Sequence, residues 1–327
     1  MKKNLIVAAL LMILAFTVIA CAGSESGPAA STPTANTPAS ETPAANTPAT
    51  TPATTPAENT TEENAPAMTG QITVVTREDG SGTRGAFVEI VDVTIDGNDN
   101  ITLEAEVAPG TSVMLTSVAE NPQAIGYAST GVALTDDRVN VVSIDGVVPT
   151  AENMLNGTYA IQRPFLIGYN TDDGLNELAQ DFVDFIMSAQ GQAIVSDRGY
   201  VPIAPSGAPQ YSASQMSGTL VLNGSSSVYS LMQYMSEAYR EINPGVTIDI
   251  HGAGTGHGIS AVRDGLADIA MSSRDLRDSE LEFMTPLAIA IDGIAVIVNP
   301  ANSTDNLSLE VVRDIFLGEI VLWEDAQ

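Results

Sequence analysis

Short apolar runs in this chain alternate with turns of small residues and with stretches of helical period. Residues 72–75, ITVV, predict a buried strand, and AFVEIV from Ala86 predicts the start of a helix. The turn between them, REDGSGTRG, has three glycines that allow main-chain amides to approach a ligand, and Ser81 or Thr83 can cap the helix. A helix N-terminus favours anions, so the turn suits an anion site. A capped turn without a ligand fits this single stretch as well.

The same pattern occurs twice more. Residues 219–222 predict a strand that is followed by a small-residue turn and a long helix, which ends at NPG. One apolar face of that helix consists of Leu231, Tyr234, Met235, Ala238, Tyr239 and Ile242. Residues 246–250 predict another strand, before the glycine-rich turn 252–258 and a short helix.

Three such units favour an α/β fold with a site for an anion. In an open, mostly parallel sheet, the turns after the carboxyl ends of strands gather at one edge, where ligands bind. Several helix N-termini, hydroxyls and one arginine would surround a small oxyanion with donors, which suits phosphate, sulfate or molybdate. GxxxxGK[ST] does not occur in the sequence, which argues against a nucleoside triphosphatase.

The first 21 residues have the pattern of an export signal. Lys2 and Lys3 precede an apolar run from Leu5 to Ile19, which is too short for a stable membrane span. The closing VIAC resembles a bacterial lipobox, which implies that Cys21 is lipidated; the alternative is an ordinary secretory signal beside an unpaired thiol. Because Cys21 is the only cysteine, an intrachain disulfide is excluded.

Composition separates a tether from a folded part. Residues 22–69 are rich in proline, threonine and alanine without an apolar period, so we expect a disordered tether that holds the folded part away from a membrane surface.

The net charge of −28 makes nucleic acid and anionic membranes poor partners. Screening acts over about 8 to 10 Å, so a buried anion site is governed by its own donors.

Other candidate residues give weaker indications. His251 and His257 are the only histidines, and neither a second cysteine nor GxSxG is present, so we expect no metal, cofactor or catalytic residue. The alternative to an anion-binding protein is an exported phosphoester hydrolase or a sensor. Asp292, at the end of an apolar strand, fits either a hinge residue or a solvated turn, and we favour the hinge.

Several segments together resemble the substrate-binding proteins of phosphate ABC transporters, the PstS family. ITVVTREDGSGTRGAF resembles the arginine-bearing phosphate motif, and NPQAIGYAS, RPFLIGYN and FVDFIMSAQGQAIVSDRGYVPI resemble later family segments. NGSSSVYSLM, GAGTGHGISAV, ADIAMSSRDL, IDGIAVIVNP and LSLEVVRDIFLGEIVLWED resemble its opening half. The resemblance covers residues 70–327, but the two halves stand in the reverse order. A circular permutation is predicted, with residues 204–217 joining the former ends; a fragment of a tandem duplication is the alternative.

The resemblance implies a two-lobed fold of the periplasmic-binding-protein type II, with mixed sheets flanked by helices. Lobe one would be 163–291, and lobe two 70–162 plus 292–327, with crossings near Arg163 and Asp292 and closure by a hinge. If the order is a permutation, Gly70 and Gln327 are neighbours in space. The protein would be an extracytoplasmic, lipid-anchored monomer that binds inorganic phosphate in its cleft and delivers it to the permease of an ABC importer.

The resemblance also implies roles for individual residues. Arg77 would pair with the oxyanion and be held by Asp79. The other phosphate-binding residues would be Ser81, Gly82, Thr83, Ser226, Ser227, Thr255 and Ser273. Several family members have an aspartate that accepts the phosphate hydroxyl where this chain has Ser273, which leaves sulfate and molybdate open as ligands. Arg84 and Arg274 fit either a second cationic group or partners of nearby surface acids.

Overall fold

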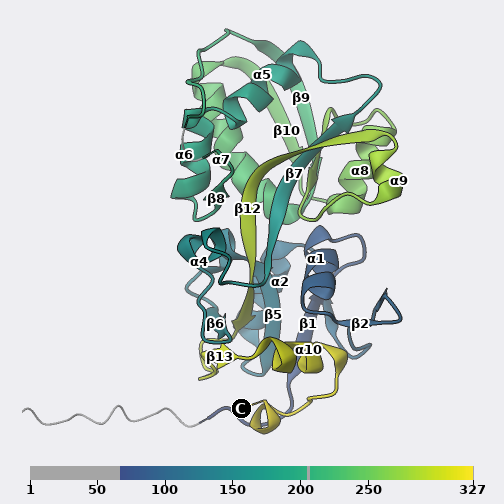
Figure 1. Cartoon of the computed structure of the whole chain (residues 1–327), viewed down its shortest axis with the longest axis vertical. Helices are drawn as coiled ribbons and strands as arrows, with labels where there is room; N and C mark the ends of the chain where they lie inside the picture. The colour runs from purple at the N-terminus through teal and green to yellow at the C-terminus, as the bar shows by residue number, and fades with distance from the viewer. Residues whose placement is uncertain (1–66, 205–206, 327) are drawn as a thin grey trace, which may run out of the picture. The chain divides into compact units, whose positions relative to one another are not determined.

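The computed structural model describes residues 67–204 and 207–326 (Figure 1). They belong to one compact unit, Glu62–Gln327. The predicted signal, the lipidation site Cys21 and nearly all of the predicted tether lie outside the described residues. No helix in the described part of the chain is both long and apolar enough to cross a membrane.

Two long strands run between two groups of elements (Figure 1). They are β7 (Gln162–Asn170) and β12 (Met284–Val298). The first group comprises β1 (Thr73–Arg77), α1 (Gly82–Ile90), β2 (Thr94–Ile95), β3 (Asn98–Asp99), β4 (Glu106–Ala108), α2 (Thr111–Glu120), β5 (Ala124–Ser129), α3 (Thr130–Ala133), β6 (Asn140–Ile144), α4 (Ala151–Leu155), β13 (Asn306–Leu307), α10 (Leu309–Leu317) and the 3-10 helix Trp323–Asp325. The second comprises α5 (Glu177–Ile186), α6 (Ala189–Asp197), β8 (Val201–Pro202), β9 (Ser217–Gly224), α7 (Ser226–Ile242), β10 (Gly245–His251), α8 (Thr255–Arg263), β11 (Ile269–Ser272) and α9 (Asp278–Leu281).

One mixed sheet continues through both groups. Its strand order is β10-β9-β11-β7-β12-β5-β1-β4. Strand β12 pairs antiparallel with β7 up to Gly293 and with β5 from Ile294 onward, so a single strand belongs to both halves of the sheet. Parallel pairs join β9 to β10 and β11, and β1 to β4 and β5. The expected mixed α/β sheet flanked by helices is confirmed.

The hydrophobic core is divided in the same way. One large cluster packs Phe87, Tyr127, Phe316 and Trp323 against the half of the sheet that contains β1 and β5. Another packs residues of α5 and α7 against the half that contains β9 and β11. Each half of the sheet therefore has its own hydrophobic core, and β7 and β12 connect the two halves.

Helix α7 can be compared with the bounds and the buried face that its apolar spacing predicts. It begins after the N-cap Ser225, whose side chain accepts from two main-chain amides, and it ends at Ile242, before the predicted NPG stop. Leu231, Met235 and Tyr239 are fully buried, as their spacing predicts. Tyr234 and Ile242, which the spacing placed on the same face, are instead 39% and 41% exposed. The guanidinium of Arg198 lies over the Tyr234 ring, 3.4 Å from its centroid.

The residues just before β1 lie against residues 322–324. The amide of Gly70 donates to a carboxylate oxygen of Glu324 (2.8 Å), and its carbonyl accepts from the amide of Trp323 (3.0 Å). Gln71 also forms a β-bridge with Leu322. Gln327 itself lies outside the described residues, but the chain three residues before it is in direct contact with Gly70.

Candidate functional site

Four helices begin directly after parallel strands of the sheet. Helix α1 follows β1, α2 follows β4, α7 follows β9 and α8 follows β10. Ser81 and Ser225 cap α1 and α7 with their side chains, whereas Gly110 and Gly254 precede α2 and α8 with positive φ angles. The N-terminal ends of these helices carry unpaired amides and partial positive charge, which is the usual environment of a bound anion.

Side chains from both halves of the sheet meet at these helix ends. Oγ1 of Thr83 lies 2.9 Å from Oγ of Ser227, and Nη2 of Arg77 donates to Oγ of Ser226 (3.1 Å). Thr111 bridges the two serines, at 3.1 Å from Oγ of Ser226 and 3.4 Å from Oγ of Ser227. The hydroxyls and the guanidinium thus form one hydrogen-bonded cluster, to which α1, α2 and α7 all contribute.

The turn before α1 also contacts the start of α8. A Cβ atom on Gly82 would overlap Oγ1 of Thr255 and lie 2.7 Å from Oγ of Ser273. The amide of Gly256 donates to the carbonyl of Gly80 (3.1 Å). Only a residue without a side chain fits at position 82, because Thr255 and Ser273 of the other half already occupy that space.

Arg77 is fixed from two sides. Its side chain is 2% exposed, and Nε and Nη2 donate to the two carboxylate oxygens of Glu78 at 2.8 and 2.7 Å. Its main-chain amide donates to the hydroxyl of Tyr127 (3.3 Å), which is also hydrogen-bonded to Thr76. Burial raises the pKa of Tyr127 to about 12, so this hydroxyl stays protonated at neutral pH.

Glu78 ties the arginine to a second helix. One of its oxygens also accepts from the amide of Gly110 (3.0 Å), directly before α2. Burial alone would raise the pKa of Glu78, but the hydrogen bonds and charge of Arg77 and the Gly110 amide outweigh it and lower the pKa. The carboxylate is therefore ionised, and it orients the arginine.

Comparison with known proteins identifies the family. Residues 40–190 and 209–327 match the family described as "PBP superfamily domain". "Phosphate-binding protein PstS 2" of Streptococcus pneumoniae serotype 4 is 42% identical over 262 residues, which cover 79% of this chain and 88% of that protein. The chain belongs to the PstS family of phosphate-binding proteins. PstS 2 of Streptococcus agalactiae serotype V is 40% identical over 270 residues, 80% of this chain and 90% of the relative.

A solved PstS structure supports the fold. The crystal structure of the phosphate-binding protein of a phosphate ABC transporter from S. pneumoniae TIGR4 has a TM-score of 0.63 and 41% identity, over 79% of this chain and 100% of that chain. The predicted periplasmic-binding-protein fold is confirmed. These PstS relatives are named as binding proteins, so the prediction of a non-enzymatic protein is confirmed at the level of the family.

The structure brings together most of the residues that the PstS resemblance implied. Of these, Arg77, Gly82, Thr83, Ser226, Ser227, Thr255 and Ser273 are linked by the contacts above, and Oγ of Ser225 donates to Oγ of Ser273 (2.8 Å). Ser81 is buried as the N-cap of α1. Arg84 pairs with Asp99 at 2.6 Å, and Arg274 pairs with the largely buried Glu280 at 2.8 Å.

The role expected for Asp79 is wrong. Its side chain is 100% exposed and pairs with Arg84 at 3.3 Å, whereas Glu78 holds Arg77. A spacing of two residues places side chains on one side only while a strand continues, and β1 ends at Arg77. Thr111 was missed, although a glycine turn between a short strand and a helix, PGTS, is the same signal as at the three recognised units.

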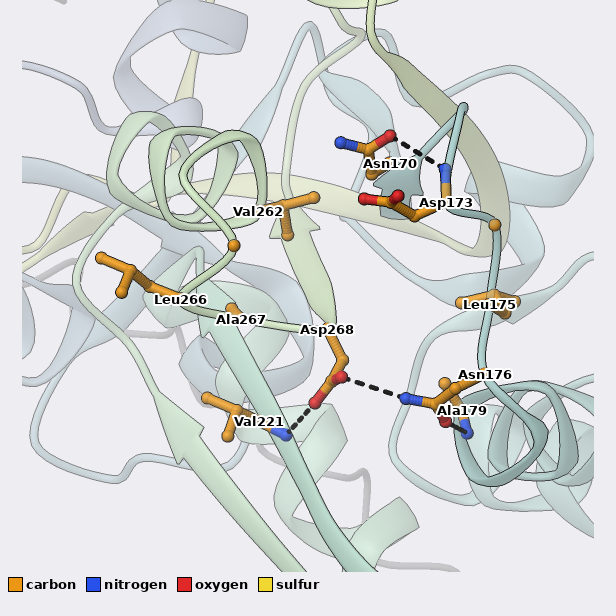
Figure 2. A pocket seen from close by; sticks show the side chains of 12 residues that line it. Asn170, Asp173, Leu175, Asn176, Ala179, Val221, Val262, Leu266, Ala267 and Asp268 are labelled. Atoms are coloured by element: carbon orange, nitrogen blue, oxygen red, sulfur yellow. Dashed lines mark hydrogen bonds between the residues drawn. The ribbon is translucent and has the colours of Figure 1, made fainter.

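A second pocket has acidic side chains in its lining, which do not suit an anion. The pocket in Figure 2 is lined by residues that include Asn170, Asp173, Asn176 and Asp268. Its volume is about 370 Å³. The carboxylate of Asp268 accepts from the amide of Val221 (2.8 Å) and from Nδ2 of Asn176 (3.1 Å). None of the predicted site residues lines this pocket. Within the described residues, no group of histidine, cysteine and acidic side chains is arranged to hold a metal ion.

Proposed function

We propose that this chain is a receptor that binds inorganic phosphate between its two halves and delivers it to an ABC importer. The observation that carries the proposal is the cluster of Arg77, Thr83, Thr111, Ser226 and Ser227 at the helix ends. A charge-assisted guanidinium contact, several hydroxyls and unpaired amides are the donors that a small oxyanion requires. The relatives named as phosphate-binding proteins support the same ligand.

The acidity of the protein is compatible with this ligand. The net charge of −28 slows the approach of an anion, but screening limits this effect to about 8 to 10 Å. At the site itself, the helix ends and Arg77 act at hydrogen-bond distance. The expected consequence is a low association rate rather than a loss of affinity.

We further propose that 163–291 form lobe one, that 70–162 with 292–327 form lobe two, and that the lobes close on the anion by a hinge. The separate core clusters support this division. Arg163 and Asp292, at the proposed crossings, are paired neighbours on β7 and β12 and form a buried ion pair at 3.0 Å. The proposed hinge therefore lies where both connecting strands are cross-linked.

The remaining proposals concern chain order and location. The contacts of Gly70 with Trp323 and Glu324 support a circular permutation, because they bring the proposed new ends together. We also propose that the protein acts as a monomer on permease subunits and is extracytoplasmic, with a lipid anchor at Cys21. The signal pattern supports the location and the anchor.

Titration calorimetry tests the ligand. We expect phosphate to bind to the folded protein more tightly than sulfate or molybdate, because the cluster presents donors to a protonated oxyanion and a carboxylate lies beside it. No measurable binding of phosphate would overturn the proposal. Tighter binding of sulfate or molybdate would establish the alternative that Ser273, a hydroxyl in place of a carboxylate, leaves open.

A further inference from the structure

Glu78 is an acidic side chain in direct contact with Arg77 of the proposed anion site. Its Oε1 atom accepts from Nη2 of Arg77 (2.7 Å), the same nitrogen that donates to Oγ of Ser226 (3.1 Å). Its Oε2 atom accepts from Nε of Arg77 and from the amide of Gly110. An anion that contacts both Arg77 and Ser226 would therefore lie beside a full negative charge.

This charge has a defined position. The side chain of Glu78 is 23% exposed, and three hydrogen bonds from Arg77 and Gly110 fix both carboxylate oxygens. An ionised carboxylate oxygen accepts two hydrogen bonds, and Oε1 accepts one from Arg77. Oε1 can thus accept one more hydrogen bond, from a ligand.

A carboxylate in this position distinguishes anions of the same size. An oxyanion that carries a proton can donate that proton to Oε1 in a hydrogen bond. An anion with the same charge but no proton places two acceptors against each other, which is repulsive. The other side chains of the cluster are hydroxyls and a guanidinium, and hydroxyls serve both kinds of anion because they donate as well as accept.

We propose that Glu78 is the residue that makes the site selective for a protonated oxyanion, hydrogenphosphate, over fully ionised anions such as sulfate. This inference rests on the proposed phosphate-binding function and assigns its selectivity to one side chain. It also gives Glu78 a role that Ser273, a neutral hydroxyl, cannot fill. The neighbouring carboxylate, Asp79, has no part in it because its side chain is fully exposed and pairs with Arg84.

The test compares Glu78→Gln with Asp79→Asn, which removes the adjacent charge by the same chemistry. Calorimetry at mildly alkaline pH measures the binding of phosphate, sulfate and monofluorophosphate to each protein. Monofluorophosphate is a tetrahedral dianion like hydrogenphosphate, but a fluorine replaces the hydroxyl. In the unaltered protein we expect phosphate to bind more tightly than both other anions. A failure of the unaltered protein to bind phosphate would contradict the proposed function itself, which is distinguishable from every result below.

In Glu78→Gln the preference for phosphate over each of the other two anions should fall by about 10- to 100-fold, the effect of one hydrogen bond to a charged group. In Asp79→Asn both preferences should stay within about twofold of the unaltered protein, as for an exposed ion pair. Equal weakening of all three anions in Glu78→Gln would mean that Glu78 only positions Arg77, and would overturn the proposal.

A second variant covers the case in which Glu78→Gln binds no anion. Glu78→Asp keeps the negative charge, and circular dichroism checks that both variants are folded. The proposal expects Glu78→Asp to retain a preference for phosphate over monofluorophosphate. A folded Glu78→Asp protein that binds both anions equally, or neither, would show that the carboxylate does not select the ligand.

Discussion

Gly82 lies at a contact between the two halves of the molecule, against the start of α8 and Ser273. A methyl group at this position would overlap Oγ1 of Thr255 and press on Oγ of Ser273, and both side chains are fully buried. Gly82→Ala should therefore hold the turn away from α8 and weaken phosphate binding at least about tenfold, a cost typical of a mild overpacking. Calorimetry measures the affinity, and thermal unfolding should show a loss of about 1 to 3 kcal/mol of stability from the same overlap.

The control for Gly82→Ala is a second glycine of the same helix. A Cβ on Gly85 would make an ordinary contact of 3.4 Å with the side chain of Arg274. Gly85→Ala should leave phosphate affinity unchanged and stabilise α1 slightly, since alanine favours the helix. If both variants bind phosphate like the unaltered protein, the close approach at Gly82 does not matter for binding.

Individual site residues were predictable to different degrees. Thr83 and Ser227 were predictable because they stand at fixed positions after a strand, where a parallel sheet gathers its turns. The partner of Arg77 was not, since the turn conformation after the last residue of β1 decides whether position 78 or 79 faces the guanidinium. Sequence spacing carries no information on that conformation.

Elements with a strong period and clear caps were predicted well. Helix α7 and strand β1 lie where their apolar patterns indicate, and Ser225 and Ser81 cap the helices that follow the turns. The short strand β4, with only three residues and two of them exposed, has no apolar alternation to reveal it. The fourth unit of the site was missed for that reason.

The two connecting strands depend on a buried ion pair. Asp292 is fully buried, accepts from Arg163 at 3.0 and 3.3 Å, and also accepts from Ser129 and Thr130. Burial raises the pKa of Asp292 and lowers that of Arg163, because both charges are kept from water. Asp292→Asn should cost about 3 to 5 kcal/mol of unfolding free energy, since it leaves the guanidinium buried without a counter-charge.

Urea unfolding checks this value against the partly exposed pair of Arg138 and Asp136, in which the Asp136 side chain is 17% exposed. Asp136→Asn removes the partner of Arg138, whose side chain is 56% exposed, and should cost less than about 1 kcal/mol. A double variant, Arg163→Met with Asp292→Leu, should recover most of the lost stability because no unpaired charge remains. A loss as small in Asp292→Asn as in Asp136→Asn would show that water reaches the hinge.

At the scale of the whole molecule, the order of the two sequence halves should be exchangeable. Gly70 contacts Trp323 and Glu324, so a short glycine and serine linker can join Gln327 to Gly70. The new ends belong between Ser212 and Ala213, which are exposed. This cut falls between Tyr211 and Ser214, whose side chains both donate to the carboxylate of Asp181. Each new end therefore keeps one hydrogen bond to Asp181.

The re-ordered protein tests whether the fold depends on spatial neighbours or on chain order. Its strands and helices keep every partner, and only the connections change, so it should bind phosphate within about threefold of the original affinity while losing some stability through the new ends. Calorimetry and thermal unfolding measure the two effects. A control with the same linker but new ends between Val296 and Ile297, inside β12, breaks the strand shared by both halves of the sheet and should not fold. If the Ser212–Ala213 variant also fails to fold, the contact at Gly70 does not reflect interchangeable ends, and a permuted order loses its physical support.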